Sequence, residues 1–156
     1  MNRYQLFVEY DGKKFNGWQI QKKGISVQKT LQIILSKLLK EKIVIYGAGR
    51  TDSGVHAIKQ CAHFDTTKKL VEKNTIKTFN FFLNKKNISV QKIVKKNKNF
   101  HARFSAKERT YLYLIRNHIS PSVLNKNKEW HIINKINLNL LKKGSKILIG
   151  THDFST

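Results

Sequence analysis

Hydrophobic and polar side chains alternate over residues 4–10, which is the pattern of a strand with one buried face. The residues on its apolar face are Tyr4, Leu6, Val8 and Tyr10. Residues 11–12 read Asp-Gly, a common turn sequence. After Ser26, which is a suitable helix N-cap, apolar residues recur every three or four positions. The pattern therefore predicts a strand over 4–10 and a helix that begins after Ser26.

Three further strands and a second helix follow. Residues 43–46 form a short β-branched run, and residues 56–66 and 88–95 are longer strand candidates. The expected face of the 56–66 strand consists of Ile58, Gln60, Ala62 and Phe64. Helical spacing between the last two strands is kept by Ile76, Phe79, Phe82 and Leu83. The order β-α-β-β-α-β predicts an α+β fold, ferredoxin-like or RRM-like, with the helices on one face of the sheet.

The remaining chain predicts the beginning of a second α/β unit. Residues 109–117 alternate as a strand whose two faces are both expected to be covered. A short strand over 130–133 and a helix that includes Leu138 follow. We therefore expect a first unit over 1–104 and a second over 105–156, which stays incomplete because no closing strands follow.

The charge balance points to a polyanionic partner. Lys and Arg number 31 against 9 Asp and Glu, which gives a net charge of +22. Nucleic acid is the first expectation for such a chain, and an anionic membrane surface is the second. Part of the lysine excess also fits coding bias, in which case many lysines are only solvated surface.

Compartment and cofactor signals are few. The sequence has no apolar run of membrane-spanning length and no signal-peptide pattern. With Cys61 as the single cysteine, no internal disulfide can form, so we expect a cytoplasmic protein without a membrane partner. The six histidines are dispersed and no phosphate-loop motif occurs, so we expect no metal and no nucleotide cofactor.

One loop combines unusual residues. Residues 47–57 read GAGRTDSGVHA, with a lone acid, Asp52, close to Arg50. An ionised carboxylate in a glycine-rich loop can serve as a nucleophile or a general base. Thr-Asp-Ser-Gly is equally good turn sequence, in which the aspartate bonds the local backbone. From these residues alone both interpretations fit, and the turn is favoured.

Four stretches together resemble the TruA family of tRNA pseudouridine synthases. They read YDGKKFNGWQIQ (10–21), GAGRTDSGVHA (47–57), NFHARFSAKERTYLY (99–113) and GTHDFS (150–155). The resemblance implies a pseudouridine-synthase-like mixed or antiparallel sheet. It also implies isomerisation of uridine to pseudouridine in the anticodon stem-loop of tRNA, without cofactor or metal.

The same resemblance assigns roles to three residues. Asp52 corresponds to the family's nucleophile, which attacks either C6 of the base or C1′ of the sugar. Arg50 is expected to pair with the aspartate and to help displace the target base. Tyr111 is expected to stack on the uracil and to assist removal of the proton from C5.

The chain is shorter than the family's usual length, so a truncated C-terminal half is expected. It is interpreted either as a fragment or frameshift product of a normal enzyme, or as a shortened gene product. The family works as a homodimer, but a truncated chain argues against a dimer and against full activity, because one wall of the cleft is missing. The alternative function is a non-enzymatic basic RNA-binding module or an inactive remnant.

Overall fold

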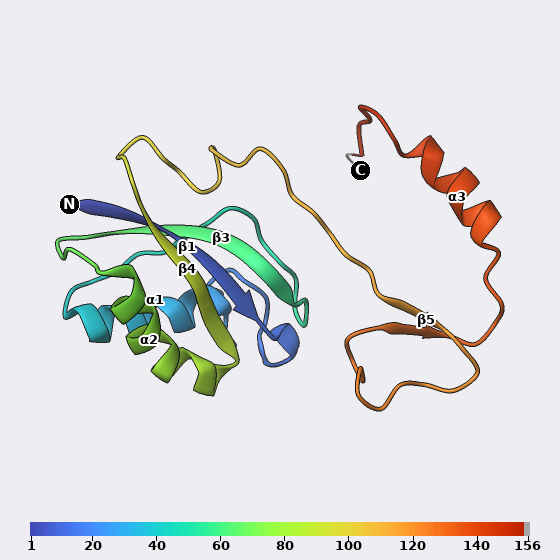
Figure 1. Ribbon diagram of the computed structural model, residues 1–156, viewed down its shortest axis with the longest axis horizontal. Coiled ribbons are helices and arrows are strands. Elements are labelled where there is room, and N and C mark those ends of the chain that lie inside the picture. Colours follow the sequence, from blue (N-terminus) through green and yellow to red (C-terminus); the bar gives the residue numbers. More distant parts are fainter. Residues whose placement is uncertain (155–156) are drawn as a thin grey trace. The chain divides into compact units, whose positions relative to one another are not determined.

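The computed structural model describes residues 1–154 and consists of two compact units, Met1–Glu108 and Arg109–Thr156. Each unit is described by itself (Figure 1). The units divide after Glu108, whereas the sequence alone predicts a boundary after residue 104. None of the helices in the described residues has the length and apolar character that a membrane span requires.

The first unit has the predicted order of elements. These are β1 (Asn2–Tyr10), α1 (Val27–Leu39), β2 (Tyr46–Gly47), β3 (Ala57–Thr66), α2 (Glu72–Leu83) and β4 (Ile88–Lys96). The sheet order is β2-β3-β1-β4, and every neighbouring pair is antiparallel. Both helices lie on one face of the sheet (Figure 1), so the predicted α+β arrangement is confirmed.

The core lies between the sheet and the two helices. The predicted apolar face of β1 is buried, with Leu6 and Val8 fully inaccessible. Helix α1 begins where predicted, because the Ser26 hydroxyl accepts the Lys29 N–H at 3.2 Å. The helix residues that pack against the sheet are Val27, Leu31, Leu35, Phe79 and Leu83.

Strand β2 is displaced along the chain from the predicted 43–46. The Ile43 N–H donates to the Ser36 hydroxyl at 2.9 Å, and the Ile45 N–H donates to the side-chain oxygen of Gln32 at 3.0 Å. Helix side chains thus take the backbone donors that a sheet ladder would use. Both isoleucines are buried, but only Tyr46 and Gly47 pair with β3.

The predicted face of the 56–66 strand is wrong at Ile58. The pairing of β1 with β3 shifts between Val8 and Tyr10, so that β3 carries an extra residue there. Such a bulge reverses the alternation of side chains beyond it. Ala62 and Phe64 are buried as predicted, whereas Ile58 is 72% exposed.

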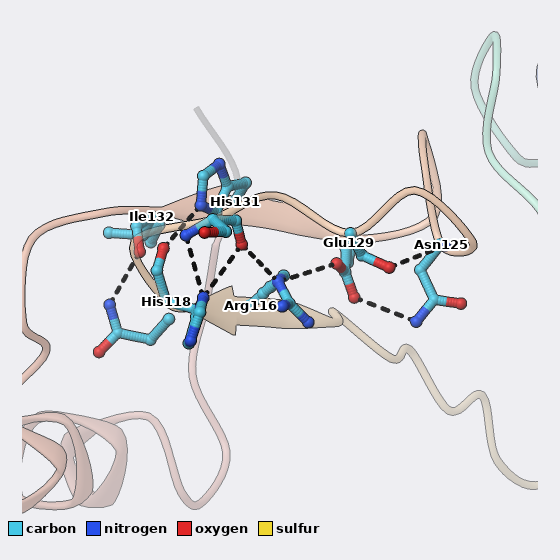
Figure 2. Close-up of polar contacts among 9 residues, drawn as sticks. Arg116, His118, Asn125, Glu129, His131 and Ile132 are labelled. Carbon is cyan, nitrogen blue, oxygen red and sulfur yellow. Dashed lines mark hydrogen bonds and ion pairs between the residues drawn. The ribbon is translucent and has the colours of Figure 1, made fainter.

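The second unit contains a small parallel sheet and a helix. These elements are β5 (Ile115–Asn117), β6 (Trp130–Ile132) and α3 (Leu138–Ile147). Figure 2 shows the polar contacts around the two strands. His131 Nε2 lies 2.7 Å from the His118 carbonyl oxygen, and Arg116 Nε lies 3.9 Å from a carboxylate oxygen of Glu129. These contacts tie the loop between the strands to both of them.

The predicted strand over 109–117 is therefore too long. Only its last three residues are strand, because in the part of the chain that the structure describes no ladder partner runs beside 109–114. The Leu114 carbonyl accepts the Trp130 N–H at 2.7 Å, next to the point where the ladder of β5 and β6 begins. The prediction that both faces are covered is also wrong, since the exposed residues include Tyr111, Leu112, Tyr113 and Leu114.

A buried histidine anchors the segment that follows β4. His63, on β3, is 1% exposed, and its Nδ1 accepts the N–H of Ala102 at 3.1 Å. The rings of His101 and Tyr46 pack against it at 4.6 and 5.0 Å between centroids. Burial, together with the nearby charges of His101 and Arg3, lowers the pKa of His63 to about 4. The imidazole is therefore neutral and serves as a hydrogen-bond acceptor.

This histidine should make stability depend on pH. In the unfolded chain His63 takes up a proton near pH 6.5, but in the folded unit only near pH 4. Its contribution is thus complete above pH 6.5 and is lost as the pH falls through this window. We expect the free energy of unfolding to drop by about 2 kcal/mol between pH 7 and pH 5 from this residue alone. Urea unfolding followed by tryptophan fluorescence at both pH values measures it.

The variant His63→Gln should flatten that dependence, because an amide oxygen accepts the Ala102 N–H without titrating. The control is His152→Gln, an exposed histidine of the second unit, which should leave the dependence unchanged. Equal slopes for the wild type and His63→Gln would contradict the assignment.

Candidate active site

The stretch that contains Asp52 forms a loop between neighbouring strands. Residues 48–56 join β2 to β3, and a bond from the Val55 N–H to the Asp52 carbonyl, 3.2 Å long, closes a four-residue turn. Gly54, the third residue of this turn, has φ +79°, as a type II turn requires there. The predicted turn is therefore present, and its bond is made by the main chain rather than by the Asp52 side chain.

Arg50 and Asp52 lie together in this loop, and both side chains are exposed. Within residues 1–154, no hydrogen bond or ion pair involves either side chain. The pairing of Arg50 with Asp52 that the resemblance implies therefore stays a prediction. The carboxylate of Asp52 is open to an incoming ligand, and so is the guanidinium of Arg50.

Two other carboxylates of this unit are engaged in structural contacts. Asp65 receives two bonds from the guanidinium of Arg3, at 2.8 and 2.7 Å, which lower the pKa of Asp65. Glu41 accepts a bond from the Thr66 hydroxyl, and this contact lowers the pKa of Glu41. Asp52 differs from both because its oxygens have no such role.

The first of the four stretches lies directly against this loop. The carbonyl oxygen of Phe15 accepts the Gly54 N–H at 3.2 Å and the Ser53 hydroxyl at 3.3 Å. The backbone on the C-terminal side of Asp52 is therefore attached to segment 11–18. The Gly54 N–H and the Ser53 hydroxyl therefore donate to a protein atom instead of to water.

Two glycines make this close approach possible. A Cβ on Gly12 would overlap the carbonyl oxygen of Val55, and a Cβ on Gly17 would overlap that of Thr51. Gly17 also has φ +87°, a conformation that other residues rarely adopt. Beside it, the N–H of Trp18 donates to the Thr51 carbonyl at 3.0 Å. The two glycines of the first stretch thus leave room for the backbone of the second stretch.

Four aromatic residues lie in segments of the first and third stretches that also contain basic residues, and their burial differs. Phe15 and Trp18 are buried in the core, so neither ring is accessible to a base. Phe100 is half-buried, with the Lys96 ammonium 5.4 Å from its ring centre. Phe104 is exposed and remains accessible to a base.

Tyr111 belongs to the second unit and is 70% exposed. The third stretch, 99–113, begins in the first unit, where Ala102 is anchored to β3, and ends in the second. The fourth stretch, 150–155, is described up to Phe154, and Ser155 lies outside the described residues. Arg50 and Asp52 thus lie in one exposed loop without a contact between their side chains, and Tyr111 belongs to the other unit.

Other reactive groups in the described residues do not add to the site. Burial raises the pKa of the Cys61 thiol, and the Gln5 amide donates to its sulfur at 3.1 Å, which suits a packed thiol rather than a nucleophile. Within residues 1–154, no group of three or more His, Cys, Asp or Glu side chains is placed so that it could hold a metal ion.

Sequence reasoning missed one connection to this loop. The strand pattern predicts Tyr10 as a core residue, and its side chain is indeed 3% exposed. Its hydroxyl, however, lies 2.8 Å from the hydroxyl of Thr51, the residue before Asp52. The one available signal was that Tyr10 opens a stretch that carries the resemblance.

Comparison with known proteins identifies the family of this chain. The sequence model of a family described as tRNA pseudouridine synthase matches residues 6–105. Proteins named tRNA pseudouridine synthase A from Pelagibacter ubique, Neorickettsia sennetsu and Maricaulis maris are 55%, 43% and 38% identical over 99–100% of this chain. The chain covers 63–64% of these relatives, and thus spans less than two thirds of their length. By these matches, the chain belongs to the tRNA pseudouridine synthase family.

Proposed function

We propose that this chain carries the catalytic loop of an enzyme that isomerises uridine to pseudouridine in the anticodon stem-loop of tRNA. The observation that carries the proposal is the carboxylate of Asp52, which is exposed on a loop whose backbone is bonded on both sides. A nucleophile needs this combination of a fixed position and an accessible charge. The relatives' name, tRNA pseudouridine synthase A, supports the same reaction.

The reaction proceeds through a covalent intermediate with Asp52. A carboxylate oxygen attacks C6 of the flipped uracil or C1′ of its ribose, and the C1′–N1 bond breaks. The uracil rotates, a C1′–C5 bond forms, and the Asp52 adduct is released. The proton of C5 leaves and N1 gains a proton, so the product is an isomer of the substrate. Covalent attachment divides one difficult glycosyl transfer into easier steps.

Arg50 and Tyr111 act on the base in this proposal. A uridine inside a stem is reached only after it leaves the stack, which costs a few kcal/mol. The guanidinium of Arg50 occupies the place of the displaced base or contacts its phosphate. The ring of Tyr111 stacks on the flipped uracil, and its hydroxyl assists removal of the proton from C5. No cofactor or metal takes part.

The partner is tRNA, which the net charge of +22 attracts through its phosphates. From the family resemblance we further propose a cytoplasmic location and, for a chain that spans the whole length of the relatives, a homodimer. A basic RNA-binding module without catalysis is the competing function. It explains the charge, but it gives no reason for the fixed loop around Asp52.

The role of Asp52 predicts a loss of turnover on substitution. Asp52→Asn should lower tritium release from tRNA labelled at C5 of uridine by at least about 1,000-fold, because no covalent adduct forms. Glu9→Gln, which neutralises an exposed carboxylate of β1, should stay within about twofold of the wild type. Tritium release that survives Asp52→Asn would rule out its role as nucleophile. Release only after the part of the relatives that this chain does not span is supplied would locate the defect in the missing wall of the cleft. No release even then would favour the binding module.

The role of Tyr111 predicts a different pattern. Tyr111→Leu should lower kcat/KM about 10- to 100-fold, the value of one lost base stack. Tyr111→Phe keeps the stack, so any further loss measures the contribution of the hydroxyl. Tyr113→Leu, two residues away and 84% exposed, is the control and should have little effect. Equal losses at both tyrosines would count against a specific contact of Tyr111 with the uracil.

Binding of tRNA should depend steeply on salt. We expect a slope of log K against log salt concentration of about −4 or steeper, since several phosphates are neutralised. The measurement is fluorescence anisotropy with labelled tRNA from about 50 to 300 mM salt. Asp52→Asn should leave the slope unchanged, because the nucleophile neutralises no phosphate. A shallow slope would show that most lysines are solvated surface without a part in binding.

A further inference from the structure

The stretch 10–21 has no role in the proposed reaction, yet it makes the main contacts with the loop of Asp52. Its contacts fall on both sides of the nucleophile. The Trp18 N–H bonds Thr51 on the N-terminal side, and the Phe15 carbonyl bonds Ser53 and Gly54 on the C-terminal side. All of these contacts are made to or from the backbone of the stretch.

Tyr10 adds a bond between two side chains, in addition to the pair of Asp11 and His56, whose Oδ1 and Nδ1 atoms lie 3.1 Å apart. Its hydroxyl lies 2.8 Å from Thr51 Oγ1, and the whole side chain is 3% exposed. A buried hydroxyl without a partner is costly, so this bond holds both groups in place. The ring of Tyr10 is itself held by Trp18, with 6.0 Å between their centroids.

The hydroxyl of Tyr10 also stays uncharged over the working pH range. Burial raises the pKa of Tyr10, and the Thr51 hydroxyl only partly opposes this effect. At neutral pH both hydroxyls therefore keep their protons, and the bond between them is not lost by ionisation of Tyr10.

Asp52 needs such support because its carboxylate has no bond of its own within residues 1–154. The direction in which the side chain leaves the loop is thus set by the backbone alone. In nucleophilic attack, misplacement of the reacting atom by about 1 Å can cost a factor of 100. A bond to the residue directly before the nucleophile acts on this direction.

We propose that Tyr10 is a positioning residue, whose hydroxyl fixes Thr51 and thereby orients the carboxylate of Asp52 toward the substrate. The inference rests on the proposed function, since it assumes Asp52 as the nucleophile. It also assigns a purpose to the first stretch, which is to hold the catalytic loop through its backbone and through side chains that include the buried Tyr10 hydroxyl.

The test compares two tyrosines of the same strand. Tyr10→Phe removes the hydroxyl and keeps the ring. Tyr4→Phe is the matched control, since Tyr4 is 4% exposed, lies on the same face of β1, and uses its hydroxyl to accept the Leu70 N–H at 2.9 Å, away from the loop. Tyr10→Phe should lower kcat about tenfold and leave KM for tRNA within about twofold, whereas Tyr4→Phe should leave both unchanged.

The other end of the bond gives an independent variant. Thr51→Val should reproduce the loss seen in Tyr10→Phe, and Thr51→Ser, which keeps the hydroxyl, should restore the wild-type rate. The double variant Tyr10→Phe/Thr51→Val should be no slower than either single variant, because both remove one interaction. Thr51→Val also keeps the test decisive if Tyr10→Phe fails to fold.

Amide hydrogen exchange gives a second readout that does not depend on turnover. The N–H groups of Gly54 and Val55, which close the loop, should exchange about tenfold faster in Tyr10→Phe and Thr51→Val than in the wild type or Tyr4→Phe. Rates and exchange that match the wild type in both variants would overturn the inference. If the loop loosens while Asp52→Asn still turns over, the proposed function fails instead, and the two failures are distinguishable.

Discussion

The site depends on the contact between segment 11–18 and the loop that carries Asp52. Both segments are irregular backbone. Each supplies hydrogen-bond partners for backbone groups of the other that form no bonds within the sheet. The approach is so close that Gly12 and Gly17 leave no room for a side chain. Because its backbone is held in this way, the loop can present the exposed carboxylate of Asp52 without hydrogen bonds to the carboxylate itself. Backbone bonds hold the loop, and within the described residues the carboxylate of Asp52 has no bond that an incoming ligand would have to break.

The distribution of charge follows the same division between structure and chemistry. Asp65 binds Arg3, and Glu41 binds Thr66 at the end of β3. These contacts lower the pKa of both carboxyl groups. Asp52 is left without a partner, although the chain has a large excess of cations. The net charge of +22 is compatible with the polyanionic substrate proposed above.

The sequence predicted the framework of the first unit well, because alternation and helical spacing directly reflect which face is buried. Its predictions were wrong where side chains take the backbone N–H groups that a sheet would use, and where the strand pairing is irregular or absent. Gln32 and Ser36 satisfy the donors of Ile45 and Ile43, so β2 begins later than its β-branched residues indicate. The bulge in β3 turns Ile58 outward, and alternation contains no sign of it. In the second unit, the alternation over 109–114 describes a strand that has no ladder within the described residues.

By itself, the sequence determined the order of strands and helices, the large positive charge, and the family, because four ordered stretches are specific to that family. It also singled out Arg50, Asp52 and Tyr111 through that resemblance. Only the tertiary structure showed why the first two stretches occur together. Gly12, Gly17 and Tyr10 are far from Asp52 in the chain, and their use depends on atoms that meet across the end of a folded sheet. Such contacts leave no periodic pattern, since they are set by the path of two loops rather than by the burial of a regular face.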